Sequence, residues 1–555
     1  MLIKRESIMS ENSVSTERLS KRNLWGYSMG GIGRDMAYQL VNTYLLTFIL
    51  FTKELTTAQF GSISVIMILC RIFDGCNDPF MGSLIEITRT KIGKFKPWIL
   101  AGVITNVAVI MALFWVPLTG KNYVIFFVFG YLLWGITYTM NDISYWGMMP
   151  SLTSNPQDRN NLATLANIGA GIGAALAIVS IPFFTAGKFT IGGNAVTAYG
   201  VISAVVCALF IACQIMTVLV VKEKPLPPVA TVNGEKRTLK EMFKVIFHND
   251  QLKPVMISML FYSVGSAIMM GLSTYWIYFR FGYQGFLVTL FTILSGISAV
   301  IIVFYPMLSK KHSRRWIAKL SMCMIFTGYT LLLVLGLITG ATKVSGSIGI
   351  FVMLALCGAF ASFGQTLFYQ VLTISVANTV EYNEYTTGLR DEGVIFACRP
   401  FTTKLGSAIC VGITSATLMI LGVNNVTKKI AEQENLMNMG QIASEEIKLA
   451  KINEIIAGVS PSVSQWLIVA MTVLPLLILA VSFIVYFKKY NISEERYDEI
   501  CAEIAKRKLA AEVVEESLTD GSADVAELNA DVSSSDAVTL ADELEKEVAS
   551  DEGKA

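Results

Sequence analysis

The segment RIFDGCNDPFMGSL, residues 71–84, places an arginine, two aspartates and an asparagine inside an otherwise apolar stretch. The apolar run FGSISVIMILC precedes it, and a basic turn followed by the run WILAGVITNVAVIMALF comes after it. An ionisable side chain within a membrane-spanning helix is costly, and it usually has a function and a partner. The surrounding sequence therefore decides the fold, and the charges within the segment indicate the function.

The composition is that of a membrane protein. Of the 555 residues, 53% are hydrophobic and 15% are charged, whereas a soluble chain carries about 25% charged residues. Apolar runs of about 20 residues, long enough to cross the hydrocarbon core as helices, recur along the chain. The nine cysteines include no CxxC pair, so they are interpreted as packing residues rather than as a metal site or a disulfide framework.

The apolar runs predict twelve membrane-spanning helices, near residues 24–51, 60–87, 97–118, 122–149, 163–186, 196–221, 254–281, 284–308, 316–339, 346–377, 394–421 and 464–487. Loops after even-numbered segments are rich in lysine and arginine, as in TRTKIGKFKP and SKKHSRR. Because basic residues are enriched in cytoplasmic loops, both termini are predicted to be cytoplasmic in the cell membrane. The long loop 423–462 is predicted to lie outside.

The predicted helices form two groups of six. A long polar stretch separates the groups, and the turns TRTKIGKFKPW and SKKHSRRW give the two halves a weak internal repeat. Such halves are typical of transporters whose site lies at the midplane. The predicted domains are an N-terminal segment 1–22, a six-helix bundle 23–222, a central cytoplasmic loop 223–252, a second bundle 253–488 and a cytoplasmic tail 489–555. The tail is predicted to be helical after an N-cap at Ser493 and disordered from Thr519 onward.

The second predicted helix presents three oxygen-bearing side chains on one face. Asp74 and Asn77 are three residues apart, and Asp74 and Asp78 are four residues apart, so all three point the same way. Two carboxylates this close in a medium of low dielectric constant need a positive partner. That partner is a bound cation, a proton or a basic side chain, and Arg71, one turn earlier, is one candidate for the last.

The fourth predicted helix offers a matching polar face. Thr139, Asp142 and Trp146 follow one another at helical spacing, and the first predicted helix adds Arg34 and Asp35. Oxygen ligands from two helices suit a small hard cation, whereas carboxylates beside an aromatic ring suit a sugar. The alternative for Trp146 is an ordinary position at the membrane interface, where tryptophan is common.

The run FDGCNDPFMGSLIEITRTKIGKFKPWIL, together with YLLWGITYTMNDISYWGMMP, resembles the glycoside–pentoside–hexuronide:cation symporters. This family is a branch of the major facilitator superfamily that includes the sodium-coupled melibiose permease. The resemblance extends over about residues 25–487. It implies an all-α membrane protein with twelve transmembrane helices in two six-helix bundles, followed by a cytoplasmic C-terminal tail.

The resemblance also implies two sites. The cation site of the family falls on Asp74, Asn77, Asp78 and Thr139. Its substrate contacts fall on Asp35, Tyr138, Asp142, Trp146, Tyr369 and Lys404. Arg399 adds a positive charge that would suit a uronic acid carboxylate; the alternative is a structural ion pair with an aspartate of the first or second helix. Asn167 stands where the melibiose type has an arginine, which weakens any expectation of melibiose itself.

Four charged residues near the predicted inner mouth form a predicted cytoplasmic gate: Arg159, Glu381, Glu384 and Arg390. Related carriers close this side with ion pairs between the corresponding loops. The alternative is that these are ordinary solvated loop charges. Since exposed ion pairs contribute little free energy, a gate of this kind would only bias two states of similar energy.

The predicted function is symport of a glycoside, oligosaccharide or hexuronide with a monovalent cation, sodium, into the cell by alternating access. Proton-coupled symport of a sugar or glucuronide is the alternative, and a non-transporting membrane sensor is a further one. An enzyme is not expected, because the sequence shows no nucleophile–base pair, metal cluster or phosphate-binding loop. The expected partners are the sugar, the transported Na+ or H+ and the lipid bilayer, with no cofactor, no nucleic acid and a monomeric chain.

Overall fold

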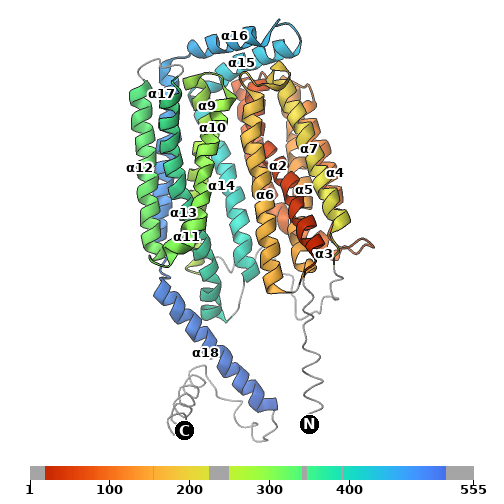
Figure 1. Ribbon diagram of the computed structural model, residues 1–555, viewed down its shortest axis with the longest axis vertical. Helices are drawn as coiled ribbons and strands as arrows, with labels where there is room; N and C mark the ends of the chain where they lie inside the picture. The colour runs from red at the N-terminus through yellow and green to blue at the C-terminus, as the bar shows by residue number, and fades with distance from the viewer. Residues whose placement is uncertain (1–18, 154, 224–248, 341–346, 389–391, 520–555) are drawn as a thin grey trace.

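Each of the twelve predicted segments coincides with helix in the computed structural model of the chain, which describes residues 19–153, 155–223, 249–340, 347–388 and 392–519. The first six are α2 (Lys21–Thr52), α3 (Thr57–Ile87), α4 (Lys96–Trp115), α5 (Gly120–Leu152), α6 (Pro156–Thr185) and α7 (Ala195–Val220). The others are α9 (Leu252–Phe281), α10 (Gly285–Gly296) with α11 (Ile301–Ser309), α12 (Arg314–Gly340), α13 (Ile348–Thr387), α14 (Glu392–Ile420) and α17 (Pro461–Lys489). Figure 1 shows them running side by side.

Ten of these helices are long and apolar enough to cross a membrane. Two segments fall outside that set: α2, which carries Arg34 and Asp35, and the eighth segment, which the 3-10 turn Ile297–Val300 divides into α10 and α11. Polar groups and broken helices at membrane depth are tolerated where neighbouring helices cover them. The chain is thus a multi-pass membrane protein with an all-helical fold.

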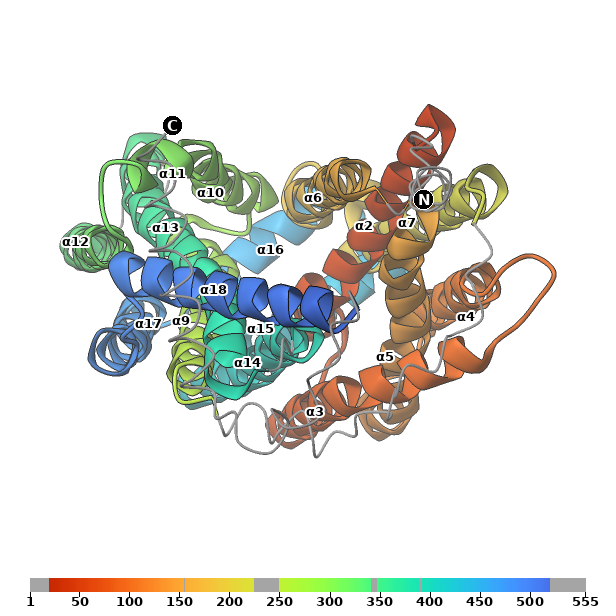
Figure 2. The same ribbon diagram turned by 90° about the horizontal axis from the view of Figure 1, so that it is seen from below.

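The helices form two bundles, each with its own apolar core. Seen from below, α2 to α7 gather on one side and α9 to α14 with α17 on the other (Figure 2). The cores of the first bundle are built from its own helices. The core of the second bundle includes Leu50, Phe51, Phe60 and Ala186 from the first bundle, all near the end that α15 and α16 cover. The bundles therefore share apolar contacts at that end.

Glycines allow α6 to approach α2 closely. A methyl group at Gly173 would lie 2.0 Å from the carbonyl oxygen of Ile32, and one at Gly169 would lie 2.3 Å from that of Ser28. Small residues at such interfaces are typical of membrane helices, because they let the backbones come together. This contact fixes the position of α2, which carries Arg34 and Asp35.

Two structures lie outside the bundles, at opposite ends. The predicted loop 423–462 forms two helices, α15 (Val423–Asn438) and α16 (Glu445–Ala457), which cover the upper end in Figure 1. The tail forms α18 (Glu494–Thr519) at the lower end. As expected, Ser493 caps this helix, since its Oγ accepts from the N–H of Arg496 at 3.2 Å. The acidic segment after it, and most of the central loop, lie outside the described residues.

Candidate functional site

Helices α3, α5 and α14 bring three predicted cation ligands together with one lysine. Thr139 Oγ1 donates to Asp74 Oδ1 at 2.8 Å and lies 3.4 Å from Asp78 Oδ1. Lys404 Nζ lies 2.6 and 2.8 Å from the two carboxylate oxygens of Asp78 and 3.0 Å from Asp74 Oδ2. We call these four residues the carboxylate cluster. Since α14 belongs to the second bundle, the cluster joins the two bundles.

The basic side chain at the carboxylates is Lys404 rather than Arg71. Arg71 Nε donates to the hydroxyl of Tyr131 at 2.8 Å, and its NH2 group donates to Asn42 Oδ1. The sequence assigned Lys404 to the substrate, whereas the structure places its ammonium group on the predicted cation ligands. Sequence spacing could not indicate this contact, because it joins residues more than 300 positions apart.

The carboxylate cluster has a surplus negative charge. Two carboxylates and one ammonium group leave a formal charge of −1. Lys404, Asp74 and Asp78 expose 22%, 15% and 30% of their side chains, so none of the three is fully buried. Asn77, the fourth predicted ligand, is buried on the same helix, and within the described residues its Nδ2 has no hydrogen-bond partner. Carboxylate, hydroxyl and amide oxygens are ligands that a hard cation prefers.

A second polar group surrounds Arg34 in the first bundle. Its guanidinium is 2% exposed and lies 2.6 Å from Asp35 Oδ2 and 3.1 Å from Asp142 Oδ1. The same guanidinium lies over the rings of Tyr145 and Trp146, at 4.5 and 4.9 Å from their centroids. Three of the predicted substrate residues thus meet at one arginine. The cation–π contact also explains why Trp146 faces inward rather than serving only as an interfacial residue.

Tyr138 lies in an aromatic row beside this group. Its ring centroid is 5.1 Å from that of Tyr38 and 5.9 Å from that of Trp134. Tyr138, Asp142 and Trp146 recur at four-residue spacing along α5, which places them on one face of the helix. Asp142 interacts electrostatically with Lys404 and Asp74, so the Arg34 group and the carboxylate cluster are neighbours in one polar region.

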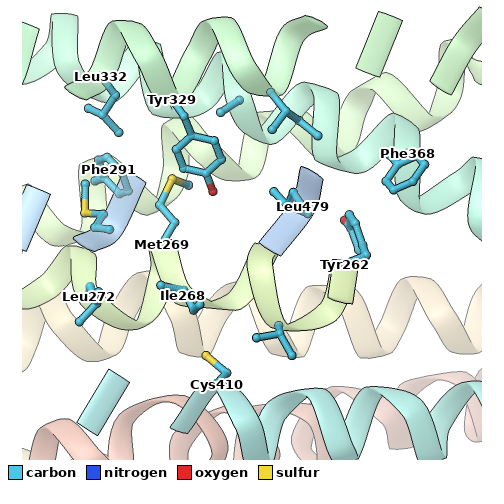
Figure 3. Packing of buried hydrophobic residues seen from close by; sticks show 14 of the residues in the cluster. Tyr262, Ile268, Met269, Leu272, Phe291, Tyr329, Leu332, Phe368, Cys410 and Leu479 are labelled. Atoms are coloured by element: carbon cyan, nitrogen blue, oxygen red, sulfur yellow. The ribbon is translucent and has the colours of Figure 1, made fainter. Parts of the chain in front are cut away.

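In the second bundle, Arg399 and Tyr369 contact each other. Arg399 NH2 donates to the hydroxyl of Tyr369 at 2.5 Å, and the Tyr369 ring stacks on Tyr262 at 5.7 Å. Figure 3 shows Tyr262 on the packed side of α9 near Phe368 and Leu479. The hydroxyl of Tyr262 donates to the Gln365 carbonyl at 3.0 Å. The core of the second bundle therefore supports the tyrosine that holds Arg399.

Two of the predicted gate residues contact groups outside the predicted gate. Glu384 Oε1 lies 2.7 Å from Lys508 Nζ of α18, and Arg159 NH2 lies 3.4 Å from the carbonyl oxygen of Thr153. Glu381 lies one turn before Glu384 on α13, and Arg390 lies outside the described residues. The contact with α18 arises because this helix crosses beneath the second bundle (Figure 2). The gate stays a prediction.

The charge pair of Glu434 with Lys448 was not predicted from the sequence. Glu434 and Lys448, in α15 and α16, are fully buried and lie 3.1 Å apart. Nothing in their spacing indicates a contact, since they are on separate helices in a stretch interpreted as a loop. The amphipathic pattern of α15 was the available signal, because a helix with one apolar face has to pack that face against something.

Known proteins provide a comparison for this arrangement. A family model described as MFS/sugar transport protein matches residues 26–494. The lactose permease of Lactobacillus helveticus is 26% identical, over 88% of this chain and 72% of that protein. A glucuronide carrier protein homolog of Escherichia coli (strain K12) is 25% identical, over 89% of this chain and 97% of that protein.

A solved structure shares the fold. It is titled a bacterial homolog to the human lysosomal transporter Spinster, in an inward-facing and unoccupied conformation. The TM-score is 0.57 at 12% sequence identity, and the match covers 87% of this chain and 99% of the other. At this identity the likeness concerns the arrangement of the helices alone.

Proposed function

Because this chain belongs to the MFS/sugar transport protein family, we propose that it carries a glycoside, an oligosaccharide or a hexuronide across the membrane together with a sodium ion. The protein is a transporter and not an enzyme. The observation that supports cation coupling is the carboxylate cluster, in which Asp74, Asp78 and Thr139 of one bundle meet Lys404 of the other. One monovalent cation would bring the formal charge of this cluster to zero.

The cluster suggests how an ion could act on the two bundles. Lys404 holds the bundles together through both carboxylates, and a sodium ion bound to Asp74 and Asp78 would compete with its ammonium group. Weakening that contact frees the bundles to move relative to each other. Because Asp142 is electrostatically linked to Lys404, the same event alters the field at the Arg34 group, where the sugar is proposed to bind.

Coupling of this kind is reciprocal. If sodium raises the affinity for the sugar, the sugar raises the affinity for sodium by the same factor. One charge that moves inward gains about 2.3 kcal/mol per 100 mV of membrane potential. This free energy drives the accumulation of a neutral sugar against its gradient.

The proposed orientation places α18 inside and α15–α16 outside, in agreement with the basic loops near α18. In the described part of the chain, polar contacts join the bundles at the carboxylate cluster and at the α15–α16 end. For example, Thr289 Oγ1 of α10 donates to the Val179 carbonyl of α6 at 2.9 Å. We therefore infer that the described conformation is closed at the α15–α16 end.

Proton coupling is the second candidate, and the position of Lys404 favours it. The ammonium group already lies between the two carboxylates, where an ion would bind. A proton could be taken up by either carboxyl group without displacing the lysine. The retained Asn77 and Thr139 support sodium instead, because a proton needs no such oxygen ligands.

Uptake by membrane vesicles tests the proposal. Labelled lactose and a labelled glucuronide are supplied while sodium, lithium and proton gradients are imposed separately. Sodium-stimulated uptake that is lost in the Asp78→Asn variant and kept in the Cys76→Ser variant supports the proposal. Cys76 is the matched control because it lies on the same helix and its side chain is exposed. Uptake driven by a pH gradient alone supports the proton alternative, and no uptake of any glycoside under any gradient contradicts both.

Arg399 provides the test of substrate class. A guanidinium group held by Tyr369 is suited to a carboxylate, which it binds with two hydrogen bonds. If the substrate is a uronide, Arg399→Gln should reduce uptake of the glucuronide and leave uptake of the neutral disaccharide nearly unchanged. An equal loss for both substrates would assign Arg399 a structural role.

A further inference from the structure

Helices α15 and α16 belong to the second bundle by sequence but bind the first bundle. They follow α14 directly, at Gly422, and they cover the upper end of the molecule in Figure 1. Their polar contacts reach Thr52, Glu54 and Thr57 at the junction of α2 and α3, and Gly193, Ala195 and Thr197 at the start of α7. We call α15 and α16 together the cap.

A fully buried charge pair lies at the centre of this contact. The carboxylate of Glu434 accepts from the N–H of Ala195 at 2.7 Å and from Lys448 Nζ at 3.1 Å. Lys448 Nζ also donates to the Gly193 carbonyl at 2.6 Å. Burial raises the pKa of the Glu434 carboxyl group, and the charge of Lys448 and the Ala195 N–H oppose that rise. Each member of the pair thus has a backbone partner in the first bundle.

Amide side chains extend the contact around this pair. Asn435 Nδ2 donates to the Thr52 carbonyl at 3.0 Å and to Glu54 Oε1 at 2.8 Å. Asn438 Oδ1 accepts from Thr197 Oγ1 at 3.1 Å. All of these bonds cross from one bundle to the other, so they cannot survive a separation of the bundles at this end.

We propose that the cap is a latch, which fastens the second bundle to the first at this end and has to detach in every transport cycle. The proposal rests on the proposed function, because alternating access requires this end to open. It assigns a role to Glu434 and Lys448 that differs from ion or sugar binding. The pair holds one of the two conformations closed, and the amide contacts set how readily the latch releases.

A reversible cross-link tests the latch directly. Thr197→Cys and Asn438→Cys, combined in a variant without the nine native cysteines, place two thiols across the contact between the bundles. Oxidation is expected to reduce uptake at least about tenfold, and a reductant is expected to restore it. Uptake by the cross-linked protein at the level of the reduced protein would overturn the proposal. The reduced protein and the two single-cysteine variants report whether transport itself works, so a failed latch is distinguished from a failed function.

A second measurement does not depend on the cross-link. In a variant with Thr197→Cys as the only thiol, labelling by a membrane-impermeant maleimide reports how often the cap detaches. Asn435→Ala removes two bonds to the first bundle and should increase the labelling rate several-fold. Glu432→Ala, an exposed position on the same helix, is the matched control and should leave the rate unchanged. Equal rates in both variants would contradict the latch.

Discussion

Within the residues that the structure describes, two groups of ionised side chains join the bundles, and they differ in exposure and in charge. In the carboxylate cluster, Lys404, Asp74 and Asp78 expose between 15% and 30% of their side chains, and their formal charges sum to −1. In the cap, Glu434 and Lys448 are fully buried, and their formal charges cancel. One more positive charge would neutralise the first group, whereas the second group is already neutral.

This difference in exposure and charge indicates that the two groups have different roles. A buried pair is costly to separate, because each partner left alone keeps its desolvation penalty. A partly exposed group with surplus charge can exchange one partner for another at a lower cost. The carboxylate cluster is therefore suited to binding and releasing a cation, whereas the pair in the cap is suited to holding one arrangement closed.

The largest expected effect is on stability, at the cap. Lys448→Met leaves Glu434 buried without its partner, which costs about 3–5 kcal/mol. We expect a lower midpoint of thermal unfolding and a lower yield in detergent. The double variant Glu434→Met/Lys448→Met should recover much of the loss, since it leaves no unpaired charge. Equal destabilisation in the single and double variants would show that packing, rather than charge pairing, sets the cost.

At the carboxylate cluster we expect a large effect on uptake and a small effect on stability. Lys404→Met removes hydrogen bonds to charged groups, each worth about 1.5–3 kcal/mol. Losing one of them is expected to lower the uptake rate about 10- to 100-fold. Thermal stability should change by less than about 1 kcal/mol, because water and cations can take the place of the ammonium group. Lys404→Arg keeps the charge and is the control. A loss of stability as large as that of Lys448→Met would erase the distinction between the two groups.

Closure at the cap end can also be weakened by a substitution that changes no charged residue. A methyl group at Gly285 would lie 1.8 Å from the carbonyl oxygen of Pro182 in the other bundle, whereas one at Gly296 on the same helix meets no atom within 4 Å. Overpacking of this kind costs about 1–3 kcal/mol. Gly285→Ala should therefore increase maleimide labelling of Thr197→Cys, and Gly296→Ala should not. Equal labelling would mean that the cap alone holds this end closed.

The smallest effect is expected at α18. The pair of Glu384 with Lys508, whose side chain is 59% exposed, should contribute less than about 1 kcal/mol. Lys508→Ala is expected to increase proteolysis of α18 no more than about fivefold, and moderate salt should have the same effect on the unmodified protein. A larger change would show that α18 holds its end of the molecule as firmly as the cap holds the opposite end.

Hydrophobic patterning predicted most of the fold. Spans of apolar residues predicted the helix boundaries within a few positions, except at the start of α6 and the end of α13, which extend 7 and 10 residues beyond the predicted segments. The Ser493 N-cap of α18 was confirmed. The loop 423–462 was the exception. Its helices are short and partly polar, so length and hydropathy did not distinguish them from a loop. Their stability comes from the contact with the first bundle, which no local pattern contains.

For the candidate site, helical spacing was sufficient within one helix. It placed Asp74 with Asp78 on α3, and Asp142 with Trp146 on α5, because residues three or four apart share a face. Contacts between helices were not accessible in the same way. The sequence could state that the carboxylates need a positive partner, but it could not choose Lys404 over Arg71.

The sequence by itself determined that this chain spans a membrane many times, that it forms two helical halves, and that acidic side chains lie deep within one of them. The periodicity of apolar residues and their free energy of transfer into the membrane are local properties, because they depend only on residues that are close together in the sequence. Only the tertiary structure decided which charge meets which, from Lys404 on the carboxylates to Glu434 on the first turn of α7. Those contacts join residues hundreds of positions apart, and they depend on how whole helices pack.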